Sequence, residues 1–235
     1  MATGDDIFRL ALKHVGEPYI LGSVVPMNNK NWRGPWDCAE FVSWCVFQAS
    51  GILYGCQNDH LPNPGLVDAF TGWWRRDADL LGTKIGVGLA SQTVGGVVLR
   101  YPQPGMMGHI VICDGKGGTV EAHSHVDGVM RGVITGRRWD TGVLVPGIQY
   151  TQNATPVVVT PPTLIFRLTN PYMRGQMIRD IQAKLKSLGF NPGLIDGIYG
   201  EQTAAAVHGF QLSNGLLTDG EVGPETAKAL GVALP

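Results

Sequence analysis

The sequence predicts two domains, an α+β domain followed by a small all-α domain of three helices. Three observations lead to this fold class. A helical pattern begins at Cys38, strand-like runs separated by glycine-rich turns follow it as far as residue 135, and the pattern after Tyr172 is helical throughout. A helix followed by consecutive strands is typical of a helix packed on an antiparallel sheet. The 235 residues are enough for two domains, each with its own core.

The expected elements of the first domain follow in chain order. Apolar residues at helical spacing predict helices over residues 7–14, 38–49 and 68–79. Strand-like runs come next, at residues 94–101, 109–114, 119–123 and 129–135. The sequence GKGG at residues 115–118 predicts a tight turn between the second and third of these strands.

The start of the second helix carries the most informative residue, Cys38. Asp37 followed by Glu40 has the spacing of a capping box, which makes Cys38 the first residue of the helix. Unpaired backbone N–H groups and the helix dipole favour a thiolate at that position, and a thiolate is the nucleophilic form of cysteine. The alternative is a small buried hydrophobic residue that happens to begin a helix.

A cysteine nucleophile needs a base and a group that orients the base. His109 begins a buried strand, and the next strand carries Glu121 and His123 two residues apart, on one face and roughly across from His109. Cys38, His109 and one of Glu121 or His123 therefore form a candidate triad. The sequence does not decide whether Glu121 or His123 is the third member. In the alternative interpretation, His109, Glu121 and His123 are ordinary strand or surface residues.

Metal binding is a rival interpretation of the same segment. His109, Glu121, His123 and His125 could ligate zinc, but their spacing matches no zinc motif. The four cysteines contain no C-x-x-C pair and do not resemble a disulfide framework in a chain of this length. We therefore expect neither a metal nor another cofactor.

The boundary between the domains is predicted from composition. Residues 1–150 form the first domain, the Thr/Pro/Val-rich residues 151–171 a linker, and residues 172–235 the second domain. An edge strand at residues 157–159 is the alternative to a linker. The second domain contains an internal repeat, DGIYGEQTAAAV and DGEVGPETAKAL, in which a turn precedes a helix. It has no cluster of ionisable residues, which is typical of a binding module rather than a catalyst.

Charge and hydropathy exclude several classes of protein. The net charge of −1 argues against a basic surface for nucleic acid or an anionic membrane. No run reaches the roughly 18 to 20 apolar residues of a membrane span, so no membrane insertion is expected. The acidic start MATGDD lacks the pattern of a signal peptide, which predicts synthesis in the cytoplasm without a Sec leader.

The first 150 residues resemble the NlpC-type cell-wall cysteine peptidases, which have a papain-like fold. The matching segments are VGEPY (15–19), DCAEFV (37–42), GHIVICDG (108–115) and VEA (120–122). The resemblance implies that Cys38 is the nucleophile and His109 the general base. It also implies that Asp37 binds the free amine of a stem peptide and that Tyr19 lies beside the thiolate.

Two positions depart from the pattern of that family. Ala39, at a substrate-binding position, replaces the usual serine of Asp-Cys-Ser-Gly. The third polar residue of the family, often histidine, falls at Glu121, with His123 two residues further on. The resemblance therefore leaves the choice between Glu121 and His123 open.

The last 65 or so residues resemble a three-helix peptidoglycan-binding module. The matching segments are IQ (181–182), DGIYG (196–200), TAAAV (203–207), FQ (210–211), GL (215–216) and DGEVG (219–223). Together the resemblances imply a monomeric cell-wall hydrolase that binds bacterial peptidoglycan and cleaves an amide of the stem peptide. A wall-binding module without a leader fits a phage or prophage endolysin.

Two alternatives to this function stay open. The same residues could form an N-acetylmuramoyl-L-alanine amidase, which cuts the bond between sugar and peptide. In the other, the chain is a non-catalytic wall-binding or phage structural protein and Cys38 is structural.

Overall fold

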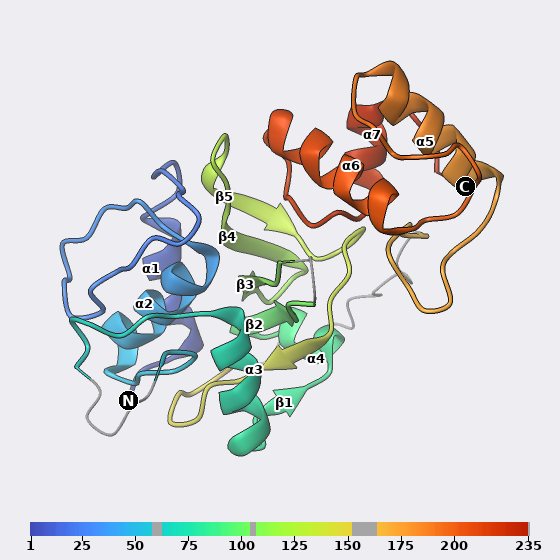
Figure 1. Cartoon of the computed structure of the whole chain (residues 1–235). Helices are drawn as coiled ribbons and strands as arrows, with labels where there is room; N and C mark the ends of the chain where they lie inside the picture. The colour runs from blue at the N-terminus through green and yellow to red at the C-terminus, as the bar shows by residue number, and fades with distance from the viewer. Residues whose placement is uncertain (58–62, 104–106, 152–163, 235) are drawn as a thin grey trace. The chain divides into compact units, whose positions relative to one another are not determined.

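The computed structural model describes residues 1–57, 63–103, 107–151 and 164–234. Its contacts divide the chain into two units (Figure 1). Unit 1 comprises Met1–Ile134 and Trp139–Val159, and unit 2 comprises Thr135–Arg138 and Thr160–Pro235. Most of the predicted linker, and with it the alternative strand at 157–159, lies outside the described residues.

Unit 1 contains a six-stranded sheet in the order β1-β6-β2-β3-β4-β5 (Figure 1). All neighbouring strands pair antiparallel. The strands are β1 (Lys84–Ile85), β2 (Val94–Arg100), β3 (His109–Asp114), β4 (Gly118–Ser124), β5 (Gly128–Val133) and β6 (Thr141–Val143). The α+β class predicted for the first domain is confirmed.

Helices pack against both faces of this sheet. The helices of unit 1 are α1 (Gly4–Leu12), α2 (Cys38–Ser50), α3 (Thr71–Leu80) and α4 (Val87–Ser91). Alternate residues of β3 divide between the faces, as strand geometry requires. Ile110 and Ile112 belong to the main core with α1 and α2, whereas Val111 and Cys113 pack with Ala90 of α4.

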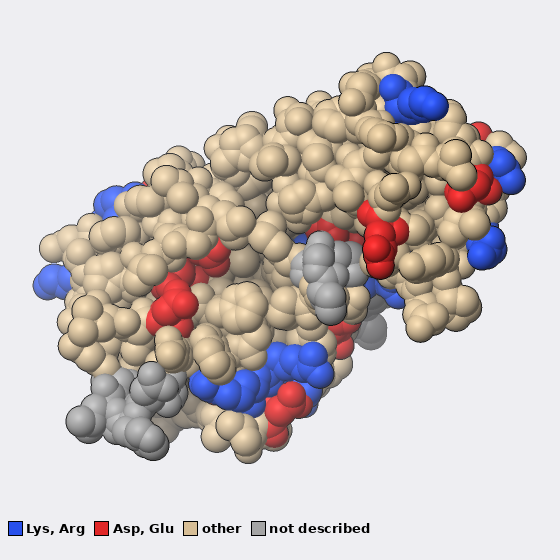
Figure 2. Space-filling view, in the orientation of Figure 1, with Lys and Arg blue, Asp and Glu red and all other residues tan. Residues whose placement is uncertain are grey.

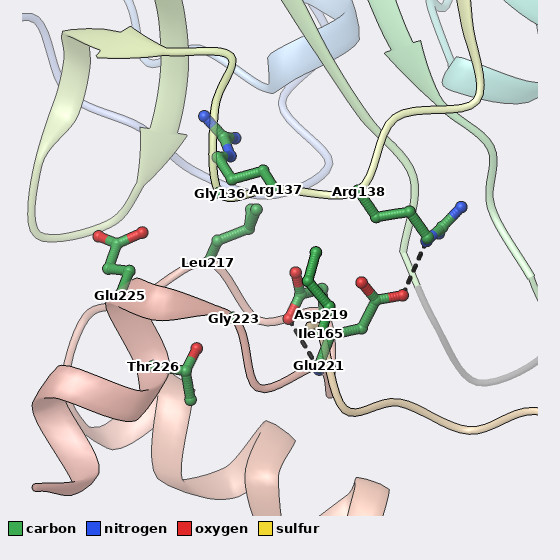
Figure 3. Close-up of a pocket in the computed structure, with 10 residues that line it drawn as sticks. All are labelled: Gly136, Arg137, Arg138, Ile165, Leu217, Asp219, Glu221, Gly223, Glu225 and Thr226. Carbon is green, nitrogen blue, oxygen red and sulfur yellow. Dashed lines mark hydrogen bonds and ion pairs between the residues drawn. The ribbon is translucent and has the colours of Figure 1, made fainter. Parts of the chain in front are cut away.

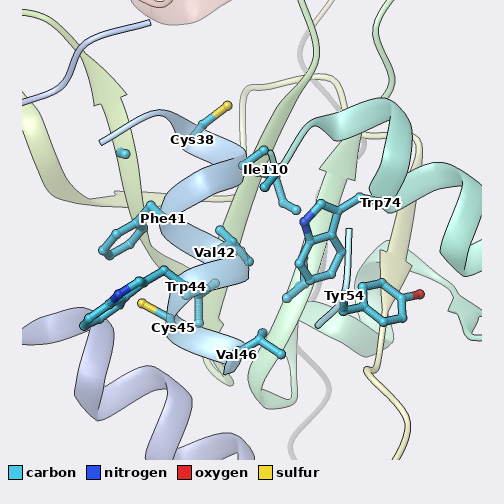
Figure 4. Close-up of a cluster of buried hydrophobic side chains, with 14 of the residues drawn as sticks. Cys38, Phe41, Val42, Trp44, Cys45, Val46, Tyr54, Trp74 and Ile110 are labelled. Carbon is cyan, nitrogen blue, oxygen red and sulfur yellow. The ribbon is translucent and has the colours of Figure 1, made fainter. Parts of the chain in front are cut away.

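The main core of unit 1 is rich in aromatic side chains. Trp44 and Phe41 of α2 pack edge-on against Trp36, and Trp74 of α3 packs against Tyr54. Figure 4 shows how α2 lies between these two aromatic groups. Burial of several large aromatic rings on both sides fixes the helix, and therefore its first residue Cys38, relative to the sheet.

The ends of α2 show one correct and one wrong prediction. The helix begins at Cys38 and ends at Gly51, whose positive φ closes it. The expected capping box is wrong, because the carboxyl group of Glu40 is buried and accepts a hydrogen bond from the Ala69 N–H at 3.0 Å. The side chain that caps α2 is that of Asp37 alone.

The described residues of unit 2 form three helices, α5 (Gln176–Ser187), α6 (Glu201–Ser213) and α7 (Pro224–Leu230). Their apolar faces share a core that includes Ile181 and Leu185 of α5, Val207 and Phe210 of α6, and Leu230 of α7. The prediction of a small all-α second domain is confirmed.

The face of the molecule seen in Figure 2 is mostly uncharged. Figure 2 shows Lys, Arg, Asp and Glu as separate groups on a largely tan face, in keeping with the 16% of charged residues. Within the described part of the chain, the helices are too short or too polar to cross a membrane.

Candidate active site

Cys38 stands at the first position of α2 and is 7% exposed. The carboxylate of Asp37 closes the helix start, since Oδ1 accepts from the Ala39 N–H at 3.0 Å and Oδ2 accepts from the Gly22 N–H at 3.1 Å. Ala39 itself is buried. Two predicted substrate-binding residues, Asp37 and Ala39, therefore set the local backbone around the thiol.

The thiol of Cys38 is not a preformed thiolate. Burial, and after it the negative charge and hydrogen bond of Asp37, raise the pKa of Cys38 well above its ordinary value. The charge of Arg100 and the Ala39 N–H act in the opposite direction but are weaker. The expectation of a thiolate from the helix N-terminus alone is therefore wrong for the resting protein, and attack requires a base.

Tyr19 is held near the start of α2 by its backbone. Its backbone pairs with that of Trp36, two residues before Cys38. Burial, with smaller contributions from the charges of Cys38 and Asp37, raises the pKa of the Tyr19 phenol. The phenol therefore stays protonated and is able to donate a hydrogen bond.

His109 forms a buried pair with Glu121. The Nε2 atom of His109 lies 2.7 Å from Glu121 Oε2, and Thr119 Oγ1 donates to Glu121 Oε1 at 2.7 Å. All three residues are at most 2% exposed. His123 takes another partner, since its Nδ1 lies 3.0 Å from Asp127 Oδ2 and its ring meets that of His109 edge-on with the centroids 6.2 Å apart.

The position of the pair relative to the sheet follows from strand alternation. His109 and Glu121 lie on the opposite side of their strands from Ile110 and Val120, which pack in the main core with α2. The His109 ring accordingly contacts Trp139, with the centroids 6.1 Å apart. Because His109 is the first residue of β3, its ring lies at an end of that strand rather than beneath a helix.

Arg100, at this end of the sheet, acts electrostatically on Cys38, and the sequence analysis did not identify it as a site residue. It is the last residue of β2, the ladder partner of His109, and 2% exposed. Its positive charge lowers the pKa of Cys38. The sequence did contain a signal for this site residue, namely a charged residue directly after the apolar run VVL (97–99).

The remaining candidates do not join this group. His125 is exposed, and in the described ranges no three or more His, Cys, Asp or Glu residues are arranged to hold a metal ion. The four cysteines, Cys38, Cys45, Cys56 and Cys113, are free and buried. Burial also raises the pKa values of Cys45 and Cys113.

Comparison by sequence finds relatives among cell-wall proteins. Residues 174–230 match the family model of a putative peptidoglycan binding domain, which confirms the C-terminal resemblance. N-acetylmuramoyl-L-alanine amidase CwlL of Bacillus licheniformis is 40% identical over 79 residues, 31% of this chain and 22% of that protein. Amidase CwlM of Mycobacterium tuberculosis is 45% identical over 56 residues, 24% of this chain and 14% of that protein. The chain spans about a quarter or less of these relatives.

Comparison of structures finds proteins named for NlpC or P60 domains. The NlpC/p60 domain of peptidoglycan hydrolase SagA is 23% identical, with a TM-score of 0.42, over 61% of this chain and 100% of that one. The P60 domain of the Mycobacterium avium subspecies paratuberculosis antigen MAP1204 is 18% identical, with a TM-score of 0.41, over 60% and 91%. NlpC1 from Trichomonas vaginalis is 16% identical, with a TM-score of 0.40, over 63% and 45%.

Proposed function

We propose that this chain is a peptidoglycan hydrolase that cleaves an amide of the stem peptide by attack of Cys38. The observations that support it best are the buried His109–Glu121 pair at the start of β3 and a cysteine that begins a helix. A buried carboxylate bonded to an imidazole has the geometry of an oriented general base. The match of residues 174–230 to a peptidoglycan binding domain indicates the substrate.

In this mechanism His109 removes the proton from Cys38 as the thiol attacks the carbonyl carbon. Because Glu121 lies on Nε2, the proton acceptor is Nδ1, and attack requires Nδ1 and the Cys38 sulfur to come within hydrogen-bond distance at the end of β3. Glu121 holds the ring orientation and stabilises the imidazolium that forms. Thr119 in turn holds the Glu121 carboxylate.

The remaining steps follow from acyl transfer. The backbone N–H of Cys38 and the phenol of Tyr19 stabilise the oxyanion of the tetrahedral intermediate. Imidazolium then returns its proton to the leaving amine, and a thioester with Cys38 forms as the carbon–nitrogen bond breaks. A water molecule, deprotonated by His109, cleaves the thioester and restores the thiol.

The second unit supplies the wall-binding site in this proposal. Linking a weak binding site to a catalytic site raises the local concentration of substrate without any new contact at the catalytic residues. The enzyme therefore acts at the cell wall. A soluble stem peptide does not benefit from wall binding and should be a poorer substrate than intact peptidoglycan.

A second candidate is cleavage of the bond between the sugar and the peptide. The observation in its favour is that the sequence relatives are named N-acetylmuramoyl-L-alanine amidases. The similarity to them covers less than a third of this chain, and the same Cys38 and His109 would perform either cleavage. The two candidates differ in the fragments that they release.

The test is mass spectrometry of the soluble fragments released from purified peptidoglycan. Stem-peptide cleavage predicts sugars that keep a shortened peptide, whereas amidase cleavage predicts intact peptides and peptide-free sugars. Absence of any new fragment from several wall chemistries, with wall binding intact, would establish the non-catalytic alternative.

A further inference from the structure

The internal repeat of unit 2 has a structural counterpart. The Nε2 of Gln182, in α5, lies within hydrogen-bond distance of two acceptors of the first Asp-Gly loop and of Thr203 Oγ1 in α6. Its Oε1 accepts from the Gly197 N–H at 2.8 Å. Gln211 of α6 makes the corresponding bonds to the second loop, where its Oε1 accepts from the Gly220 N–H at 2.8 Å. One buried glutamine thus holds each loop in the same conformation.

Each of these loops lines a pocket with the same positions. The first pocket includes Asp196, Ile198, Gly200, Gln202 and Thr203, and the second includes Asp219, Glu221, Gly223, Glu225 and Thr226. The cavity volume is about 520 Å³ in the first pocket and about 30 Å³ in the second. The repeat therefore produces two equivalent pockets, of which the first is far larger.

The second pocket is small because other residues of unit 2 occupy it. Figure 3 shows Arg138 beside Glu221, and its Nε donates to Glu221 Oε1 at 2.8 Å. A side chain added at Gly223 would meet the Gly136 carbonyl oxygen at 2.9 Å. At the equivalent Gly200 an added Cβ would meet nothing within 4 Å.

The large pocket presents charges of both signs around apolar groups. Arg174 contributes a cation, and Asp196 and Glu201 contribute carboxylates. Hydrogen bonds from Gln182 and from the Ile198 N–H lower the pKa of Asp196, which is therefore ionised at neutral pH. Tyr172 and Leu194 supply exposed apolar surface, with Leu194 78% exposed.

We propose that this pocket binds the stem peptide of peptidoglycan rather than its sugar strand. The proposal rests on the charges of the pocket. A stem peptide bears carboxylates that Arg174 attracts and an amine that Asp196 and Glu201 attract. The sugars of a peptide-substituted strand are mostly neutral. A pocket of several hundred cubic ångströms accommodates a few amino-acid residues. The inference rests on the proposed function, since it takes peptidoglycan as the partner.

The test uses the full-length chain with Cys38→Ala, so that no probe is hydrolysed. The probes are a synthetic stem tetrapeptide with free termini, peptide-free glycan strands and intact purified peptidoglycan. Gly200→Leu blocks the pocket without backbone strain, since Gly200 has a φ of −91° and an added side chain enters open space. Ala183→Leu, an exposed position on α5 outside the pocket, is the matched control.

We expect Gly200→Leu to abolish tetrapeptide binding and to lower wall binding at least tenfold, with Ala183→Leu unchanged. Arg174→Gln should weaken tetrapeptide binding roughly twofold to fivefold, as loss of one exposed ion pair does, while Lys186→Gln does not. Unaltered thermal unfolding of each variant shows that the fold is kept.

Three results would overturn the inference, and they are distinguishable. Full wall binding by Gly200→Leu would reject the pocket but leave the proposed hydrolase intact. Binding of glycan strands in place of the tetrapeptide, lost in Gly200→Leu, would keep the pocket and reject the ligand. Absence of wall binding by the Cys38→Ala parent would reject the wall-binding role on which the inference rests.

Discussion

At the scale of single residues, burial decides the chemistry of this protein. Glu121 and His109 are buried as a hydrogen-bonded pair, whereas Cys38 and Glu40 are buried in surroundings that oppose their ionisation. The sequence indicated Cys38 and His109 as candidates, because each occupies the end of a strongly patterned element. It left Glu121 and His123 equivalent, since residues two apart share a face of a regular strand. In the structure their hydrogen bonds separate them.

The choice between these two residues leads to a first prediction. Glu121→Gln should lower kcat on a soluble stem peptide roughly a hundredfold or more, because a general base without its orienting carboxylate loses most of its contribution. His123→Ala should change kcat less than about threefold, since His123 pairs with Asp127. Steady-state kinetics of both variants provides the measurement, and a larger loss from His123→Ala would reject Glu121 as the orienting residue.

Glu40 gives a prediction about stability. Burial, reinforced by the charges of Asp68 and Asp37, raises the pKa of Glu40 to about 9. Between its ordinary pKa of 4.5 and about 9, the folded protein holds a proton that the unfolded chain releases, so the stability contributed at this site falls as pH rises. Glu40→Gln cannot ionise and removes that loss.

We therefore expect Glu40→Gln to be more stable than the wild type at pH 8 by about 1.4 kcal/mol or more, the equivalent of one pKa unit. At pH 4 the two proteins should differ little. Urea unfolding at both pH values measures the difference, with the exposed Glu225→Gln as a control for a solvated carboxylate. An equal difference at the two pH values would contradict the assignment.

At the scale of elements, long and strongly patterned segments were predictable and short ones were not. The predicted bounds of β3 agree with the structure, because Gly108 and the turn GKGG delimit an apolar run. β1 and β6 have two and three residues, too few to show a period, and exist because they pair with each other and with β2. Tertiary pairing, not local pattern, forms such strands.

The start of α2 illustrates competition between two uses of one residue. Glu40 has the spacing of a capping box but is drawn into the core by its bond to the Ala69 N–H. A real capping box forms at α1 instead, between Thr3 and Asp6. The spacing alone could not show which of the two helices forms a capping box, because both carry an acidic residue three positions after the cap.

Asp37 therefore has two separable effects. Asp37→Ala should destabilise the protein by about 1 kcal/mol through loss of the α2 cap. Asp37→Asn keeps a capping oxygen but removes the negative charge that raises the pKa of Cys38, so iodoacetamide should modify Cys38 at lower pH than in the wild type. Peptide mapping of alkylation against pH, beside urea unfolding, tests both effects. An unchanged alkylation profile in Asp37→Asn would show that the charge does not control the thiol.

At the scale of the whole molecule, the two units carry different kinds of chemistry. Unit 1 contains the buried ionisable groups around Cys38 and His109, and unit 2 contains two glutamine-held loops and an open pocket. The sequence predicted the α+β and all-α classes because the hydrophobic period changes between the two parts. It could not predict the open pocket. The two repeats have similar sequences, and the difference in size between their pockets depends on which other segment of the chain covers each one.

Fragment release and wall binding, measured together, test whether Cys38 performs hydrolysis on a chain that also binds the wall. Purified peptidoglycan is incubated with the wild type and with full-length Cys38→Ala, and the released fragments and the sedimented protein are quantified in the same samples. We expect Cys38→Ala to sediment with the wall as the wild type does but to release fragments at least about a thousandfold more slowly, since removal of a nucleophile eliminates its covalent path. Release by Cys38→Ala at a rate close to that of the wild type would show that Cys38 is not the nucleophile.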